Sequence, residues 1–100
     1  MRLIPQHYYV YIVSNYSRTV YHTSSSDNMR LLVYKFKRSI YNSAYERGQK
    51  TNQLMFYERF NTRKEAEERV KEIRNWDREK KEKLIKKINP QLLCINRVII

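Results

Sequence analysis

The chain has 100 residues, of which 41% are hydrophobic and 13% aromatic, with one glycine and two prolines. This length and composition predict one compact domain spanning residues 1–100, without a second domain or long low-complexity tails. Lysine and arginine number 21 against 10 acidic residues, and this net charge of +11 is typical of proteins that bind a polyanion such as DNA or RNA.

The sequence lacks the marks of membrane insertion or secretion. No apolar run approaches the roughly 20 residues that a bilayer span needs. Met1 to Gln6 lack the apolar stretch of a signal peptide. The single cysteine, Cys94, cannot form an intramolecular disulfide or a thiolate metal site. We therefore expect a cytoplasmic protein with no membrane partner, in which Cys94 is buried and inert.

A β-hairpin is expected first. Tyr8 to Val13 is a β-branched and aromatic run, Ser14-Asn15 is turn-forming, and a second short run lies around Thr19 to Thr23. Residues 24–27, three serines and an aspartate, then offer candidate N-caps for a helix. The apolar residues behind them recur at helical spacing and predict a first helix of about three turns. These residues are Met29, Leu32, Val33, Phe36 and Ile40.

A polar loop and a third strand are expected next. Residues 41–52 are polar and include the only glycine, Gly48. From Gln53 to Phe60 the residues follow the period of a strand. The expected alternation places Leu54, Phe56, Glu58 and Phe60 on one side and Met55, Tyr57 and Arg59 on the other. Glu58 is expected to be a salt-bridge partner.

Two helices are expected in the last third of the chain. Thr62 and Glu65 have the spacing of a capping box, and the residues that follow form a buried stripe. That stripe consists of Ala66, Val70 and Ile73. A basic helix is expected from Asp77 to Ile88, ended by Asn89-Pro90 because proline cannot continue the helical hydrogen bonds. Its expected buried residues are Leu84, Ile85 and Ile88, and Trp76 is expected to anchor the core between the helices, with base stacking as the alternative.

The order strand, strand, helix, strand, helix, helix predicts an α+β domain with its core at about residues 8–90. The tail, residues 91–100, is apolar from Leu92 to Ile100. We expect it to pack back on the domain or to mediate contact with a protein partner or a second copy.

Basic residues of the three expected helices are the candidate contacts to nucleic acid. They are Arg30, Lys35, Lys37, Arg38, Lys71, Arg74, Arg78, Lys80, Lys81, Lys83, Lys86 and Lys87. For the run between residues 78 and 87, a purely solvated helix face is the alternative.

Three segments of the chain resemble a nuclease family. They are residues 8–15 (YYVYIVSN), 54–60 (LMFYERF) and 65–90. In this order and spacing they are similar to the small, single-domain bacterial branch of the GIY-YIG endonuclease superfamily. The resemblance covers about residues 8–90 and implies a small three-stranded antiparallel sheet flanked by helices.

The family's active site consists of two tyrosines, a glycine, an arginine on the first helix and a glutamate on the second, placed around one divalent metal and the scissile phosphate. The glutamate anchors Mg²⁺, while metal and arginine neutralise charge on the phosphate. A tyrosine positions or deprotonates the attacking water, and glycine allows close approach of the backbone.

The resemblance carries over to six positions of this chain. The first tyrosine is retained as Tyr11, whereas His22 replaces the second tyrosine and Ser24 the glycine. An alignment shifted by one residue restores Tyr21 but puts Thr23 at the glycine position.

The remaining positions are all apolar. The arginine position falls on Leu32, or on Leu31 in the shifted alignment, a neighbouring histidine position falls on Phe36, and the metal-binding glutamate position falls on Val70. Because Leu32 and Val70 continue the apolar stripes of their helices, we expect the former pocket to have become core.

The resemblance therefore implies a catalytically inactive relative that binds DNA or RNA through its basic surface and needs no cofactor or metal. One alternative is a protein–protein interaction module on the same fold. A second alternative is an active Mg²⁺-dependent endonuclease with a relocated site that uses Tyr11 or Glu58.

Overall fold

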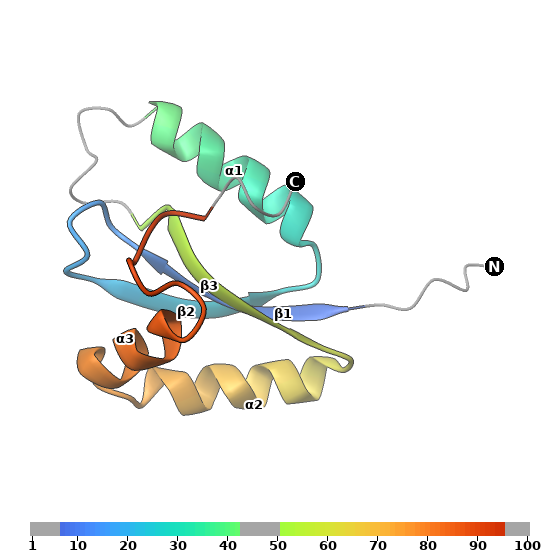
Figure 1. Ribbon diagram of the computed structural model, residues 1–100. Helices are drawn as coiled ribbons and strands as arrows, with labels where there is room; N and C mark the ends of the chain where they lie inside the picture. The colour runs from blue at the N-terminus through green and yellow to red at the C-terminus, as the bar shows by residue number, and fades with distance from the viewer. Residues whose placement is uncertain (1–6, 43–50, 96–100) are drawn as a thin grey trace.

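The computed structural model describes residues 7–42 and 51–95, with the side chains of residues 39–42 excepted (Figure 1). These residues form a three-stranded antiparallel sheet in the order β2-β1-β3 and three helices. The elements are β1 Tyr8–Ser14, β2 Tyr21–Ser26, α1 Met29–Asn42, β3 Gln53–Phe60, α2 Arg63–Arg74 and α3 Arg78–Lys86. The predicted α+β class and element order are confirmed. Most of the loop expected at residues 41–52, and the side chain of Ile40, lie outside the described residues.

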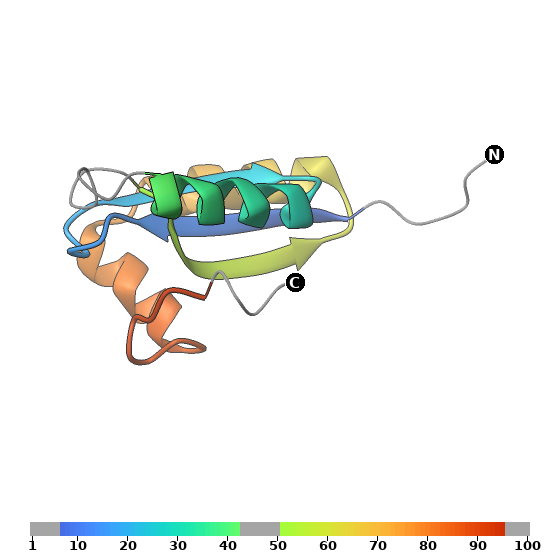
Figure 2. The same ribbon diagram turned by 90° about the horizontal axis from the view of Figure 1, so that it is seen from above.

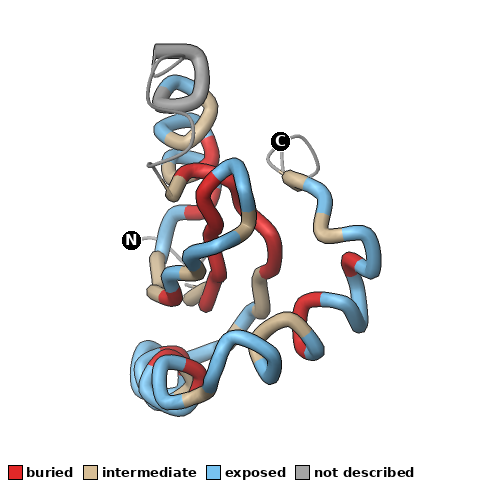
Figure 3. The backbone as a smooth tube through the Cα atoms, turned by 90° about the vertical axis from the view of Figure 1, so that its left-hand side faces the viewer, coloured by how far each residue is buried: buried red, intermediate tan, exposed pale blue. Residues whose placement is uncertain are grey.

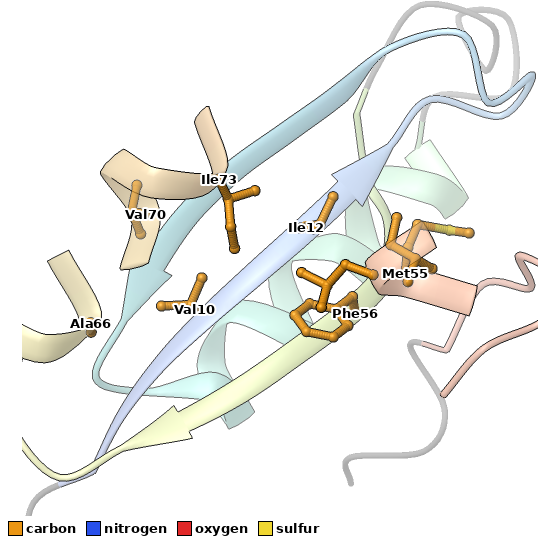
Figure 4. Close-up of a cluster of buried hydrophobic side chains, with 9 residues drawn as sticks. Val10, Ile12, Met55, Phe56, Ala66, Val70 and Ile73 are labelled. Atoms are coloured by element: carbon orange, nitrogen blue, oxygen red, sulfur yellow. The ribbon is translucent and has the colours of Figure 1, made fainter. Parts of the chain in front are cut away.

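The sheet separates two hydrophobic clusters. One helix, α1, covers one face, and α2 and α3 lie against the other (Figures 1 and 2). We call these the α1 side and the α2–α3 side. On the α2–α3 side, Val10 and Ile12 pack with Phe56 of β3 and with the apolar stripes of both helices (Figure 4). On the α1 side, Tyr11 and Val13 pack with Leu54 and the inward residues of α1. The buried part of the chain accordingly follows the strands and the inward faces of the helices (Figure 3).

An irregularity in β3 overturns part of the expected alternation. Ile12 pairs with Phe56 but the next residue, Val13, pairs with Leu54, so β3 contains one extra residue, Met55. Met55 and Phe56 both pack on the α2–α3 side, while Leu54 packs on the α1 side. The expected grouping of Leu54 with Phe56 was therefore wrong, because an extra residue in one strand reverses the side on which later residues lie.

The second strand lies later in the chain than expected. β2 begins at Tyr21, and Ser24, Ser25 and Ser26 pair with β1 instead of capping a helix. The polar backbone groups of a central strand need partners on both edges, and this requirement outweighs the weak strand propensity of serine. The cap of α1 is Asn28, whose Oδ1 accepts a hydrogen bond from the Leu31 amide at 3.1 Å.

The two C-terminal helices begin where the sequence indicates. Thr62 Oγ1 accepts a hydrogen bond from the Glu65 amide at 3.2 Å, as the expected capping box requires. Asp77 caps α3 through the Lys80 amide at 2.8 Å. However, α3 ends at Lys86, and Ile88 is 60% exposed, so its expected burial was wrong. Ile88 lies in the turn that follows the helix and is exposed there, whereas the next residue, Asn89, is buried.

The described part of the tail packs back on the domain, as expected. Leu92 packs against the cluster on the α2–α3 side and Ile95 against that on the α1 side. The Ile95 amide donates to the carbonyl of Leu54 at 2.8 Å, so the tail runs beside β3. Cys94 is only half-buried, which corrects its expected burial. Docking of a partner through the segment up to Ile100 stays a prediction, since residues 96–100 lie outside the described part of the chain.

Candidate nucleic-acid interface

The six positions carried over from the nuclease family do not line one pocket. Tyr11 is 8% exposed, and its ring packs edge-to-face on Phe36 with centroids 5.9 Å apart. Leu32 is half-buried beside them. Val70 is 6% exposed in the cluster on the α2–α3 side. The sheet therefore separates Val70 from the other helical positions.

The two remaining positions lie on β2. His22 pairs with Val13 and is exposed, and Ser24 pairs with Tyr11 and is half-buried. Both belong to the α1 side, because directly opposed residues of an antiparallel pair share a face. Tyr21, the tyrosine of the shifted alignment, points to the other side. Its hydroxyl donates to Glu82 at 2.8 Å, and burial together with this bond raises the pKa of Tyr21 to about 12.

Glu58 is engaged in an ion pair, as expected. Arg69 Nε lies 2.9 Å from its Oε1, and Arg69 also contacts Glu72 at 2.7 Å. The hydrogen bond to Glu58 raises the pKa of the Arg69 guanidinium above its ordinary value, with a smaller contribution from Glu72. Among the described residues there is no group of three or more histidine, cysteine, aspartate or glutamate side chains placed to hold a metal ion.

Trp76 anchors the junction of α2 and α3. Its ring packs against the cluster on the α2–α3 side, with the Arg69 guanidinium 5.3 Å and the Lys80 ammonium 4.5 Å from the ring centroid. The anchoring role expected for Trp76 is confirmed. Lys80, a candidate nucleic-acid contact, is therefore held against an aromatic ring of its own chain.

The twelve basic candidates are divided between the two sides of the sheet. Arg30, Lys35, Lys37 and Arg38 belong to α1. The other eight come from α2 and α3, or flank the latter in the case of Lys87. The two groups therefore form two separate surfaces.

Cations on the α2–α3 side are interspersed with acidic residues. Eight of the nine acidic residues in the described part of the chain belong to this side, and Asp27, in the turn before α1, is the ninth. Arg78 lies 3.9 Å from Glu82, and Arg74 Nε donates to the Thr23 carbonyl at 2.9 Å. Acidic residues on the same side therefore offset much of the positive charge there.

The exposed face of α1 carries basic side chains together with the exposed Leu31 and Tyr34, and no acidic side chain offsets its charge. Met29–Asn42 contains four basic residues and no acidic one. Arg30, Lys35 and Arg38 are exposed and Lys37 is half-buried. Tyr34, 55% exposed, lies among them: the Arg38 guanidinium is 5.8 Å from its ring centroid and donates to its hydroxyl at 3.2 Å. Tyr34 was missed by the sequence analysis, although its i, i+4 spacing from both Arg30 and Arg38 is a readable signal.

Arg59 of β3 adds one further cation to the α1 side. Arg59 is exposed and pairs with Tyr9 across β1 and β3, so both side chains lie on the face that α1 covers. Tyr9 and Tyr57 are half-buried there and meet edge-to-face, with ring centroids 6.3 Å apart. Tyr57 and Arg59 share one side of β3, as expected, but the sequence analysis did not place Tyr9 beside them because that depends on how β1 and β3 pair.

The chain has no significant match to a protein-family model, to a curated protein or to a solved structure. Within the described residues, no helix is long and apolar enough to span a bilayer. The assignment of function therefore depends on the geometry and charge described above.

Proposed function

We propose that this protein is a nucleic-acid-binding module without nuclease activity, and that the α1 side makes the contact. The observation that carries the proposal is the exposed face of α1, where four cations stand with no acidic residue on the helix. Phosphate groups are attracted to such a face because each contact releases counterions from the nucleic acid. A partly exposed tyrosine among the cations adds a surface on which a base can stack.

The absence of catalysis rests on the residues at the family-equivalent positions. The GIY-YIG ancestry belongs to the proposal, and the element order and three-stranded antiparallel sheet agree with what it implies. A cutting site needs a cation and a metal ligand at the scissile phosphate. Leu32 and Val70 supply neither and pack into clusters on opposite sides of the sheet.

Salt-dependent binding tests the contact surface. Labelled DNA and RNA are titrated with the protein at several salt concentrations, and the affinity is expected to fall steeply as salt rises. The triple variant Arg30→Gln, Lys35→Gln, Arg38→Gln should lower both the affinity and the salt slope, the slope by about 2 to 3.

A matched control uses the other surface. Changing Lys83, Lys86 and Lys87 to glutamine also lowers the net charge by three, from +11 to +8, but on and beside α3. This variant should bind nearly as well as the unchanged protein. Equal weakening by the two variants would show that only net charge matters, and no binding at low salt would remove the proposal.

The nuclease alternative has its own assay. Plasmid DNA incubated with the protein and Mg²⁺ should remain supercoiled. Nicking that requires Mg²⁺ and is lost in Tyr11→Phe or Glu58→Gln would instead establish a relocated active site.

A further inference from the structure

The α1 side of the sheet bears two aromatic rings that α1 leaves partly open to solvent. Tyr9 on the central strand and Tyr57 on an edge strand are half-buried and meet edge-to-face. Both pack against the margin of the cluster under α1. Among the described residues, α1 and Ile95 of the tail pack on this face, whereas α2 and α3 lie against the other (Figure 1).

The surroundings of these rings are positively charged. Arg59, exposed, pairs directly with Tyr9, and the basic face of α1 belongs to the same side of the sheet. Glu58, the neighbour of Arg59, points to the opposite side, where it is bonded to Arg69. Asp27 is the only acidic residue among the described residues that does not belong to the α2–α3 side.

Aromatic rings on a sheet discriminate between forms of nucleic acid in a way that lysine and arginine alone do not. Cations bind the phosphates of single strands and duplexes alike. An aromatic side chain can stack only on a base that is not already stacked between its neighbours. Such bases are accessible in a single strand but not in an intact duplex. Stacking also tolerates any sequence, because every base has a π-face.

Resting on the proposed function, we infer that the preferred ligand is single-stranded nucleic acid. Its bases stack at Tyr9 and Tyr57 on the sheet, and its phosphates are held by Arg59 and the cations of α1. Charge complementarity selects the anionic ligand, and the two rings select the single-stranded form.

Paired affinities test the inference. A labelled single strand and a duplex of the same sequence are titrated at one salt concentration, and the single strand should bind at least about tenfold more tightly. The variant Tyr9→Leu, Tyr57→Leu should lose about tenfold or more in single-strand affinity, with little change for the duplex. Tyr9→Phe, Tyr57→Phe keeps the rings and should bind like the unchanged protein.

The opposite face of the same strands provides the control. Tyr8 and Phe60 pair across β1 and β3 and are half-buried on the α2–α3 side. Tyr8→Leu, Phe60→Leu removes two rings of similar burial and should leave single-strand affinity unchanged. Thermal unfolding of each variant identifies any loss that comes from misfolding.

A photocrosslink supplies a result that does not depend on variants. A single strand containing a halogenated uracil, irradiated in complex with the unchanged protein, should attach to Tyr9 or Tyr57 in peptide mapping. Attachment only to α2 or α3, or a preference for the duplex, would overturn the inference while leaving salt-dependent nucleic-acid binding intact. Failure to bind any nucleic acid would instead remove the proposed function itself.

Discussion

Val70 shows at the residue scale why the proposed loss of catalysis is difficult to reverse. It is 6% exposed and belongs, on α2, to the same hydrophobic cluster as Val10 and Ile12. A carboxylate at this position would face aliphatic side chains, where an unpaired charge is costly.

We therefore predict that Val70→Glu destabilises the fold and restores nothing. The expected loss is at least about 3 kcal/mol of unfolding free energy, because the carboxylate is desolvated without a partner. Urea denaturation with and without Mg²⁺ measures it, with Lys71→Glu at the neighbouring exposed position as the control. Stabilisation of the variant by Mg²⁺, accompanied by DNA nicking, would contradict the pseudoenzyme proposal.

Tyr21 gives a second prediction for a single side chain. Its pKa, raised from 10.0 to about 12 by burial and the bond to Glu82, means that folding favours the neutral phenol. The stabilisation is complete below pH 10.0 and is lost as the pH rises through about 12. Tyr21→Phe should cost about 1 kcal/mol at neutral pH, and this cost should shrink in the alkaline range.

Ultraviolet difference titration checks the same residue directly. A tyrosine that ionises near pH 12 in the folded protein should be absent from Tyr21→Phe and present in Tyr57→Phe. A titration that is identical in both variants would show that the Glu82 contact does not hold the phenol neutral.

At the scale of elements, the buried side chain of Asn89 holds the segment after α3 against β3 through hydrogen bonds. Asn89 is 6% exposed, and its amide nitrogen donates to the carbonyls of Met55 at 3.0 Å and Leu93 at 2.8 Å. Its Oδ1 accepts from the Leu93 amide at 3.0 Å. These bonds hold the tail where the Ile95 amide can reach Leu54.

Asn89→Ala should loosen the tail from β3. We expect a loss of about 2 kcal/mol, because buried carbonyls lose their donor, and faster hydrogen exchange at the Ile95 amide. Asn61→Ala, at an exposed turn position, is the control. Unchanged exchange at Ile95 would show that packing alone holds the tail.

Elements with strong local signals could be predicted from the sequence, whereas those set by pairing could not. Thr62 with Glu65, and Asp77, mark helix starts because a cap acts within one turn. The extent of β2 depends on its pairing with β1. From the sequence alone, the three serines that pair there resemble helix caps. The extra residue at Met55 likewise leaves no local trace.

At the scale of the whole molecule, the sheet separates the basic surface of α1 from the surface of α2 and α3, where basic and acidic residues are mixed. The sequence shows that the basic residues of 29–42 have no acidic neighbours within that range whereas those of 63–87 do, but it does not show that the two groups lie on opposite sides of the sheet. That division depends on which helix covers which face, a property of chain topology. Tyr9, Tyr57 and Arg59 escaped prediction because they meet only across paired strands.

The extra residue at Met55 changes the side of the sheet on which every later residue of β3 lies. Starting from Leu54, strict alternation would turn Glu58 toward α1 and Arg59 toward α2. The acidic side chain would then stand among the cations of α1, and Arg69 would lose its carboxylate partner. The two-for-one pairing thus sets which face the charges of β3 occupy, and deletion of Met55 would remove the irregularity while Leu54, Phe56 and the residues after them kept their present sides.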